Sequence, residues 1–185
     1  KFLGVVNTQA INLHTSNLRE KATTLRAGDR VLLSGIVYTS RDAAHKRIFD
    51  LLDNGKALPY PLDDAVIYYS GATPAPTGLP IGSCGPTTSS RMDVYAPRLY
   101  DLGVVVTIGK GERSPEVIDA IRKNNAVYLC AIGGAGALSA KSVVSCEVIA
   151  FEDLGCEAVK RIEIKSFPLI VGIDCNGGNV FRRSE

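Results

Sequence analysis

The strand-to-helix unit that sets the fold class occupies residues 30–55, RVLLSGIVYTSRDAAHKRIFDLLDNG. The run from Arg30 to Val37 has the apolar character of a strand that enters the core. The apolar residues then change to helical spacing, and Asn54-Gly55 is a typical helix stop. This pattern places Arg41 and Asp42 in the first turn of the helix. A strand that passes directly into a helix predicts an α/β fold.

The rest of the chain continues this alternation and becomes β-rich towards both ends. Ser114-Pro115 combines a capping serine with a proline at the first helical position, which predicts a helix. The proline-rich stretch 73–80 is the predicted long connection. The sequence therefore predicts a single layered α/β domain over residues 1–185, with a mixed sheet. Further strands are predicted at 11–13, 65–69, 104–108, 126–132 and 143–150, followed by a β-meander of 161–164, 169–173 and 180–181 with a turn at 176–178.

Composition argues against several classes of protein. The chain has 185 residues, of which 45% are hydrophobic and 22% charged, and its net charge is +2. It has no run of Lys or Arg that could follow a phosphate backbone, so nucleic acid is not an expected partner. No apolar stretch approaches the roughly 20 residues that span a bilayer, and residues 1–6 are too short for a signal peptide. We therefore expect a cytoplasmic protein with no membrane partner.

Cysteine and histidine usage argues against a metal site in this chain. An odd number of widely spaced cysteines, without a Cys-x-x-Cys pair, indicates reduced thiols rather than disulfides. Two histidines make a zinc site improbable, and no local cluster of thiolates could hold an iron-sulfur cluster. No metal ligand is therefore assigned here. The cysteines are Cys84, Cys130, Cys146, Cys156 and Cys175, of which Cys84 is interpreted as a small buried hydrophobe.

Residues 85–93, GPTTSSRMD, place consecutive hydroxyl side chains beside a guanidinium. A proline followed by Thr and Ser predicts the start of a helix, whose unpaired N–H groups would point at a bound anion. Arg91 would then close on that anion as a fork. The alternative is a helix cap followed by a surface arginine. On the first interpretation this motif is a carboxylate or phosphate site.

Three basic residues follow predicted strands or begin predicted helices, namely Arg41, Arg91 and Lys110. A dicarboxylate needs cations at both ends, and two arginines with one lysine match that demand. The alternative for each residue is an ordinary solvated surface charge. Lys110 lies between two glycines but lacks the spacing of a phosphate loop. The small-residue stretch 133–137 is interpreted as a tight turn, with the wall of a substrate cavity as the alternative.

The motif at 85–93 resembles the Gly-Pro-Thr-Thr-x-x-Arg-Met-Asp signature of class I, iron-sulfur fumarases, in their C-terminal domain or separate beta subunit. The resemblance covers nearly the whole chain in the order of the family. Tartrate dehydratase beta subunits share most of its motifs. The other stretches that carry it are 34–47, 67–75, 108–111, 133–137 and 167–171.

The resemblance implies a swivelling β/β/α fold and the beta subunit of a hydro-lyase that interconverts (S)-malate and fumarate plus water. It implies that an alpha subunit holds a four-iron, four-sulfur cluster, and that this chain is inactive alone. By motif matching, the substrate-binding residues are Arg41, Thr87, Thr88, Arg91 and Lys110. Thr87 and Lys110 are the catalytic candidates, with Thr87 in a hydrogen-bonding or proton-relay role because its hydroxyl is a poor base. A carboxylate of the partner is expected to share the proton transfer.

Two other functions stay open at this point. An L-tartrate dehydratase beta subunit would use the same residues on another four-carbon dicarboxylate. A non-catalytic, anion-binding regulatory domain would keep the fold without the reaction. In the enzyme interpretation, the resemblance also implies contacts between like chains, a homodimer within a larger hetero-oligomer. The sequence does not decide whether the chain is a separate subunit or a fragment.

Overall fold

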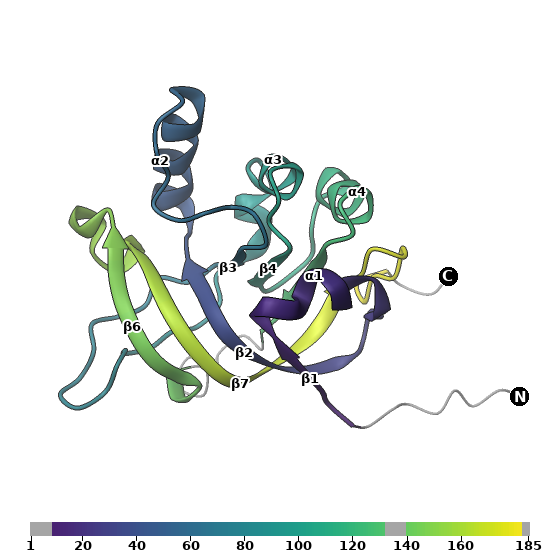
Figure 1. The fold of residues 1–185 in the computed structure, drawn as a ribbon, viewed down its shortest axis with the longest axis horizontal. Helices are drawn as coiled ribbons and strands as arrows, with labels where there is room; N and C mark the ends of the chain where they lie inside the picture. Colours follow the sequence, from purple (N-terminus) through teal and green to yellow (C-terminus); the bar gives the residue numbers. More distant parts are fainter. Residues whose placement is uncertain (1–8, 132–139, 183–185) are drawn as a thin grey trace, which may run out of the picture.

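The computed structural model describes residues 9–131 and 140–182, which form a sheet covered by helices (Figure 1). The seven strands are β1 (Ile11–His14), β2 (Arg30–Thr39), β3 (Val66–Tyr68), β4 (Val106–Gly109), β5 (Val127–Cys130), β6 (Val143–Ala150) and β7 (Val159–Ile173). The α-helices are α1 (Leu18–Lys21), α2 (Asp42–Asp53), α3 (Ala96–Asp101) and α4 (Pro115–Lys123). Short 3-10 helices are η1 (Thr15–Asn17), η2 (Ala22–Thr24), η3 (Ser89–Met92) and η4 (Glu152–Glu157).

The sheet is mixed, as predicted, and part of it closes on itself. Strands β1 to β5 lie side by side and parallel. β7 runs antiparallel to β5 and β6, and it also pairs along most of β2. Strands β2, β3, β4, β5 and β7 therefore form a closed ring, with β1 and β6 attached outside it.

Alternation along the strands sorts the apolar side chains into two clusters. Val66 and Tyr68 of β3 lie in one cluster with side chains of β2, β4, β5 and β7, while Ile67 between them lies in the other. The second cluster also contains the buried faces of α2, α3 and α4. Figure 1 shows these three helices on the same side of the sheet. The layers thus follow from the two-residue period of the strands.

The parallel strands β2 to β5 all end at the same edge of the ring. Because loops at the carboxyl ends of parallel strands form the usual ligand site of α/β folds, residues that follow these strands are placed for function. Arg41 follows β2 by two residues, and Lys110 follows β4 directly. This edge holds the candidate site described below.

The C-terminal meander predicted from the sequence is wrong in two respects. Residues 159–173 form one strand, because β2, β5 and β6 provide partners along most of its length. Ser166, at φ 50°, and a register shift between Leu33 and Gly35 accommodate the break that the sequence suggests. The segment 180–181 is a turn rather than a strand. The predicted turn at 176–178 is confirmed, and the Asp174 carboxylate accepts from two of its N–H groups.

A buried ion pair joins the signature motif to the helix layer. The Arg113 side chain is fully buried, and its Nε lies 2.7 Å from Oδ1 of Asp93. Arg113 also donates to Oγ1 of Thr107 at 3.0 Å and to the hydroxyl of Tyr69 at 3.2 Å. The second oxygen of Asp93 accepts from the backbone N–H of Ser114, the capping residue of α4. The sequence gives no sign of a role for Arg113, because its partners come from three separate segments.

We expect Asp93→Ala to destabilise the fold, because it leaves the Arg113 guanidinium buried without its carboxylate. The free energy of unfolding should fall by about 3 kcal/mol, as measured by urea denaturation. Asp101→Ala, which removes the exposed partner of Lys123, is the control and should cost less than about 1 kcal/mol. Equal losses in the two variants would contradict a special role for the buried pair.

Candidate functional site

The predicted site residues gather at the carboxyl ends of β2, β3 and β4. Arg41 is the residue that caps α2, so it stands one position before the helical turn in which the sequence had placed it. Asp42 is in that first turn, as predicted. The signature motif reaches the same edge through the long loop after β3, where Thr88 forms a parallel bridge with Lys110. The tertiary structure therefore brings the signature motif into contact with the residue that follows β4.

A short helix does begin within the motif, but two of the N–H groups that are expected to face an anion bind the protein instead. Thr88 caps the short helix η3, which starts at Ser89. The N–H of Thr87 donates to the carbonyl of Tyr69 at 2.7 Å, and the N–H of Ser89 donates to the carbonyl of Lys110 at 2.8 Å. Backbone carbonyls that follow β3 and β4 thus accept the hydrogen bonds that the sequence assigns to a bound anion. These two N–H groups are not available to an anion.

Close packing fixes the motif against β4. A Cβ on Gly109 would lie 1.9 Å from Oγ of Ser89 and 2.9 Å from Cδ2 of Tyr69. The Ser89 hydroxyl lies 2.8 Å from that of Tyr128, which in turn donates to the carbonyl of Gly111 at 2.9 Å. Gly109 is therefore needed for the close approach, and Ser89 is a buried anchor rather than a ligand-binding group.

The two candidate arginines converge on one carboxylate. Arg91 binds Asp42 through two nitrogens, with Nη2 2.8 Å from Oδ2 and Nε 3.1 Å from Oδ1. Nε of Arg41 lies 3.5 Å from Oδ2 of Asp42 and 3.4 Å from Oε1 of Glu157. The sequence places Asp42 next to the site but carries no signal for its role. Glu157 had no local signal, because it lies 116 positions after Arg41.

The site is accessible to a ligand. The side chain of Arg91 is 51% exposed, and that of Arg41 is 25% exposed. Thr88 is exposed, while Thr87 and Lys110 are half-buried. Arg41 and Arg91 are thus brought together, and Thr88 is brought to Lys110. The arrangement presents guanidinium, ammonium and hydroxyl groups at one edge, which suits an anion with more than one carboxylate.

A buried histidine supports the start of α2. Nδ1 of His45 lies 2.9 Å from Oγ of Ser40 and 3.0 Å from the carbonyl oxygen of Arg41. Complete burial lowers the pKa of His45 to about 4, so the ring is neutral at pH 7. His45 therefore holds the backbone of Arg41 without adding charge to the site.

The cysteines do not form a metal site in the described residues. Cys84 is fully buried, as predicted, and burial raises the pKa of its thiol. Burial likewise raises the pKa of Cys130 and of Cys146. Residues 9–131 and 140–182 contain no group of three or more His, Cys, Asp or Glu side chains arranged to hold a metal ion. Thiols dispersed in this way do not fit an iron-sulfur cluster, which needs several converging thiolates.

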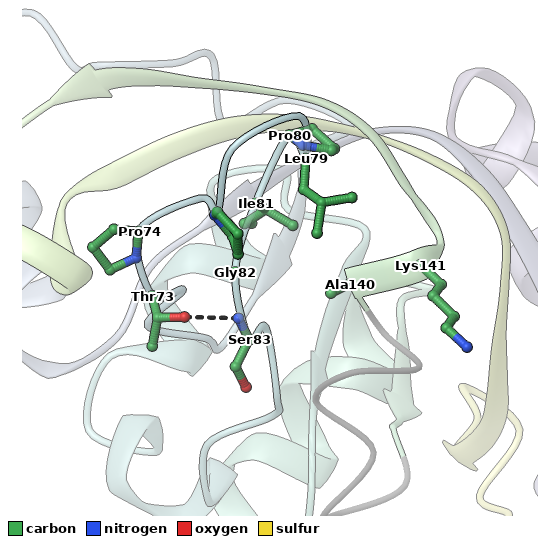
Figure 2. Close-up of a pocket in the computed structure, with 10 residues that line it drawn as sticks. Thr73, Pro74, Leu79, Pro80, Ile81, Gly82, Ser83, Ala140 and Lys141 are labelled. Atoms are coloured by element: carbon green, nitrogen blue, oxygen red, sulfur yellow. Dashed lines mark hydrogen bonds between the residues drawn. The ribbon is translucent and has the colours of Figure 1, made fainter.

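A cavity of about 450 Å³ lies away from the candidate site residues. Figure 2 shows that the proline-rich loop forms most of its wall, with Ala140 and Lys141 on the other side. Thr73 Oγ1 accepts from the N–H of Ser83 at 2.7 Å and holds the loop closed. The lining is mainly apolar, and Lys141 is the single basic residue among the described residues that line it, so they do not supply the cations at both ends that a dicarboxylate requires. The stretch 133–137 lies outside the described residues.

The helices of the described residues include none that is both long and apolar enough to cross a membrane.

We expect Gly109→Ala to push the signature motif away from β4. The added methyl group should cost about 1 to 3 kcal/mol of unfolding free energy, as is typical of overpacking. Ser89→Gly in the same chain removes the main clash, so the second change should cost less in the Gly109→Ala background than alone. A double-mutant cycle by urea denaturation measures this coupling, and additive costs within about 0.5 kcal/mol would contradict it.

The pKa of His45 predicts how stability depends on pH. Because that pKa is about 4 in the fold and 6.5 for an unperturbed histidine, the unfolded chain binds more protons between these values. The contribution of His45 to the free energy of unfolding should be complete above about pH 6.5. It should be lost progressively towards pH 4, by at most about 3 kcal/mol.

His45→Asn should remove this part of the pH dependence, as measured by urea denaturation across that range. His14→Asn, which replaces an exposed histidine, is the control and should keep the wild-type slope. A His45→Asn variant with the wild-type slope would refute the assignment.

Similarity to known proteins extends over almost the whole chain. The sequence profile described as "Fumarase C-terminus" matches residues 4–184. "Fumarate hydratase 2" of Leishmania major is 38% identical over 169 residues, covering 90% of this chain and 30% of the relative. "Fumarate hydratase class I, anaerobic" of Escherichia coli strain K12 is 40% identical over 156 residues, covering 83% of this chain and 28% of the relative.

A third relative is comparable in length to this chain. The "Putative L(+)-tartrate dehydratase subunit beta" of Methanocaldococcus jannaschii is 36% identical over 163 residues, covering 85% of this chain and 84% of the relative. The chain therefore spans about 30% of the length of the fumarate hydratases and most of the length of this subunit. With a family match over almost all of its residues, the chain belongs to the fumarase C-terminus family.

Proposed function

We propose that this chain supplies the carboxylate-binding half of a hydro-lyase active site, which interconverts (S)-malate and fumarate plus water. The observation that supports it most directly is the convergence of Arg41 and Arg91 around Asp42, at the sheet edge where Lys110 and the signature threonines also lie. The similarity to class I fumarate hydratases supports the reaction.

In this mechanism each residue acts on a carboxylate or on the proton beside it. Arg41 and Arg91 would bind the substrate carboxylates and fix their orientation. Removal of a proton next to a carboxylate builds negative charge there, and Lys110 would stabilise that charge in the transition state. Thr88 would donate a hydrogen bond, and Thr87 would hold or relay the proton. A carboxylate outside this chain would complete the proton transfer.

We further propose that a four-iron, four-sulfur cluster is held by an alpha subunit or by the remainder of a longer protein. The described cysteines of this chain do not fit the cluster, so its ligands are expected elsewhere. When bound there, the cluster would act as a Lewis acid towards substrate oxygens. The residues of this chain would hold the substrate against it.

The proposed assembly follows from the placement of the carboxylate-binding residues in this chain and of the cluster in another part of the enzyme. We propose that the chain is one domain of the swivelling β/β/α type, which the closed ring and its covering helices support. The substrate would lie between the edge that carries Arg91 and the cluster-bearing half. A homodimer contact would use a surface away from that edge.

An L-tartrate dehydratase beta subunit is the second candidate function. The relative of that description has nearly the same length as this chain, which favours it. Malate and tartrate are both four-carbon dicarboxylates, so the same arginines and lysine would serve either. Assays of the cluster-loaded complete enzyme with malate, fumarate and tartrate distinguish the two.

We expect Arg91→Lys in the complete enzyme to lower kcat/KM by an amount equivalent to roughly 2 to 4 kcal/mol, because lysine cannot pair with a carboxylate through two nitrogens. Arg98→Lys is the matched control, since Arg98 also pairs with an aspartate of α2 but at the far end of that helix. The control should keep wild-type kinetics. Unchanged kcat/KM in Arg91→Lys would make Arg91 an ordinary surface charge.

A further inference from the structure

Asp42 is the point at which the two candidate arginines meet. Its Oδ2 lies 2.8 Å from Nη2 of Arg91 and 3.5 Å from Nε of Arg41. The three side chains come from α2, its capping position and η3, so the tertiary fold brings η3 to the start of α2. Glu157 of η4 approaches Arg41 from another direction, at 3.4 Å. Each arginine therefore has a carboxylate anchor, and Asp42 is the shared one.

Electrostatics explain why an anchor is needed. Two guanidinium groups near one carboxylate repel each other, and the side chains of Arg41, Asp42 and Glu157 are only 25%, 37% and 28% exposed, which weakens screening by water. A carboxylate between the groups offsets that repulsion. Asp42 also lies in the first turn of α2, where the helix dipole favours a negative charge. Without Asp42, Arg91 would have no charged partner among the described residues.

The contacts leave much of each guanidinium for a ligand. Asp42 accepts a hydrogen bond from Nε of Arg91, and its other oxygen lies at ion-pair distance from Nη2 without forming a hydrogen bond, so the N–H groups of Nη1 and Nη2 stay available to a ligand. Arg41 turns only its Nε towards the two carboxylates. Its side chain passes over Gly71, where a Cβ would lie 3.0 Å from Nη1 and 3.1 Å from Cδ. Within residues 9–131 and 140–182, neither Nη of Arg41 donates a hydrogen bond to protein.

We propose that Asp42 is a positioning residue that holds both arginines by their Nε side and presents their remaining N–H groups to a dicarboxylate. The role of Asp42 rests on the proposed function, in which Arg41 and Arg91 bind the substrate. Asp42 itself does not touch the substrate. A correctly held pair of arginines binds the carboxylates equally in the ground state and in the transition state, so the effect of Asp42 falls on KM.

The test uses the complete enzyme, with its cluster-bearing half, and the variant Asp42→Asn. Asparagine keeps the size of the side chain but loses its charge and one of its two acceptors. We expect KM to rise at least about tenfold and kcat to change less than about threefold. Asp53→Asn is the matched control, because Asp53 lies at the other end of α2 and also pairs with an arginine. The control should keep both constants.

Glu157→Gln is the second variant, and it keeps the test valid if Asp42→Asn folds poorly by thermal melting. Glu157 contacts Arg41 but has no ion pair with Arg91. We therefore expect a smaller rise in KM than in Asp42→Asn, again with kcat nearly unchanged. Loss of kcat alone in either variant would overturn the positioning role.

Binding of succinate, a four-carbon dicarboxylate that cannot be dehydrated, separates this proposal from the proposed function. Calorimetry should show weaker succinate binding in Asp42→Asn than in the wild type. If the wild type has no hydro-lyase activity but Asp42→Asn still weakens succinate binding, the proposed function fails and the role of Asp42 stands. If the wild type is active and Asp42→Asn leaves KM and succinate binding unchanged or tighter, the role of Asp42 fails.

Discussion

The double pairing of β7 holds the rest of the structure in place. β7 runs antiparallel to β2 over most of its length and to β5 at its end, so the parallel strands between them cannot separate. Alternate side chains of these strands fill the ring, and the others pack under the helices. Because the ring is closed, the carboxyl ends of β2, β3 and β4 have fixed relative positions. Residues that follow those ends are placed by the backbone.

The backbone of the signature motif takes part in this framework. N–H groups of Thr87 and Ser89 bind carbonyls at the ends of β3 and β4, and Gly109 lets the motif approach closely. These two donors therefore build the site and do not bind an anion. Recognition of a dicarboxylate falls instead to the side chains, mainly to Arg41, Arg91 and Lys110. A side-chain site depends strongly on what holds those side chains, which is why their carboxylate partners matter.

The candidate site lies at an exposed edge rather than in an enclosed cavity. Arg91 is half exposed, and the cavity under the proline-rich loop is apolar and lies elsewhere. Water competes with hydrogen bonds and screens charge at such an edge. The two fumarate hydratases are more than three times as long as the stretch that matches this chain. Under the proposed function, their additional part or an alpha subunit would cover the edge, exclude water and contribute the cluster.

The sequence by itself determined the features that depend on neighbours along the chain. The strand followed by α2, the Ser114 cap and the family motifs are local patterns, so they could be predicted. Only the tertiary structure decided the single strand β7, the extended start of the signature motif, and the anchoring of two arginines by Asp42 and Glu157. In each of these cases, hydrogen bonds or ion pairs with residues far away in the sequence override the local conformational preference. The identity of those distant partners cannot be read from the pattern of neighbouring residues.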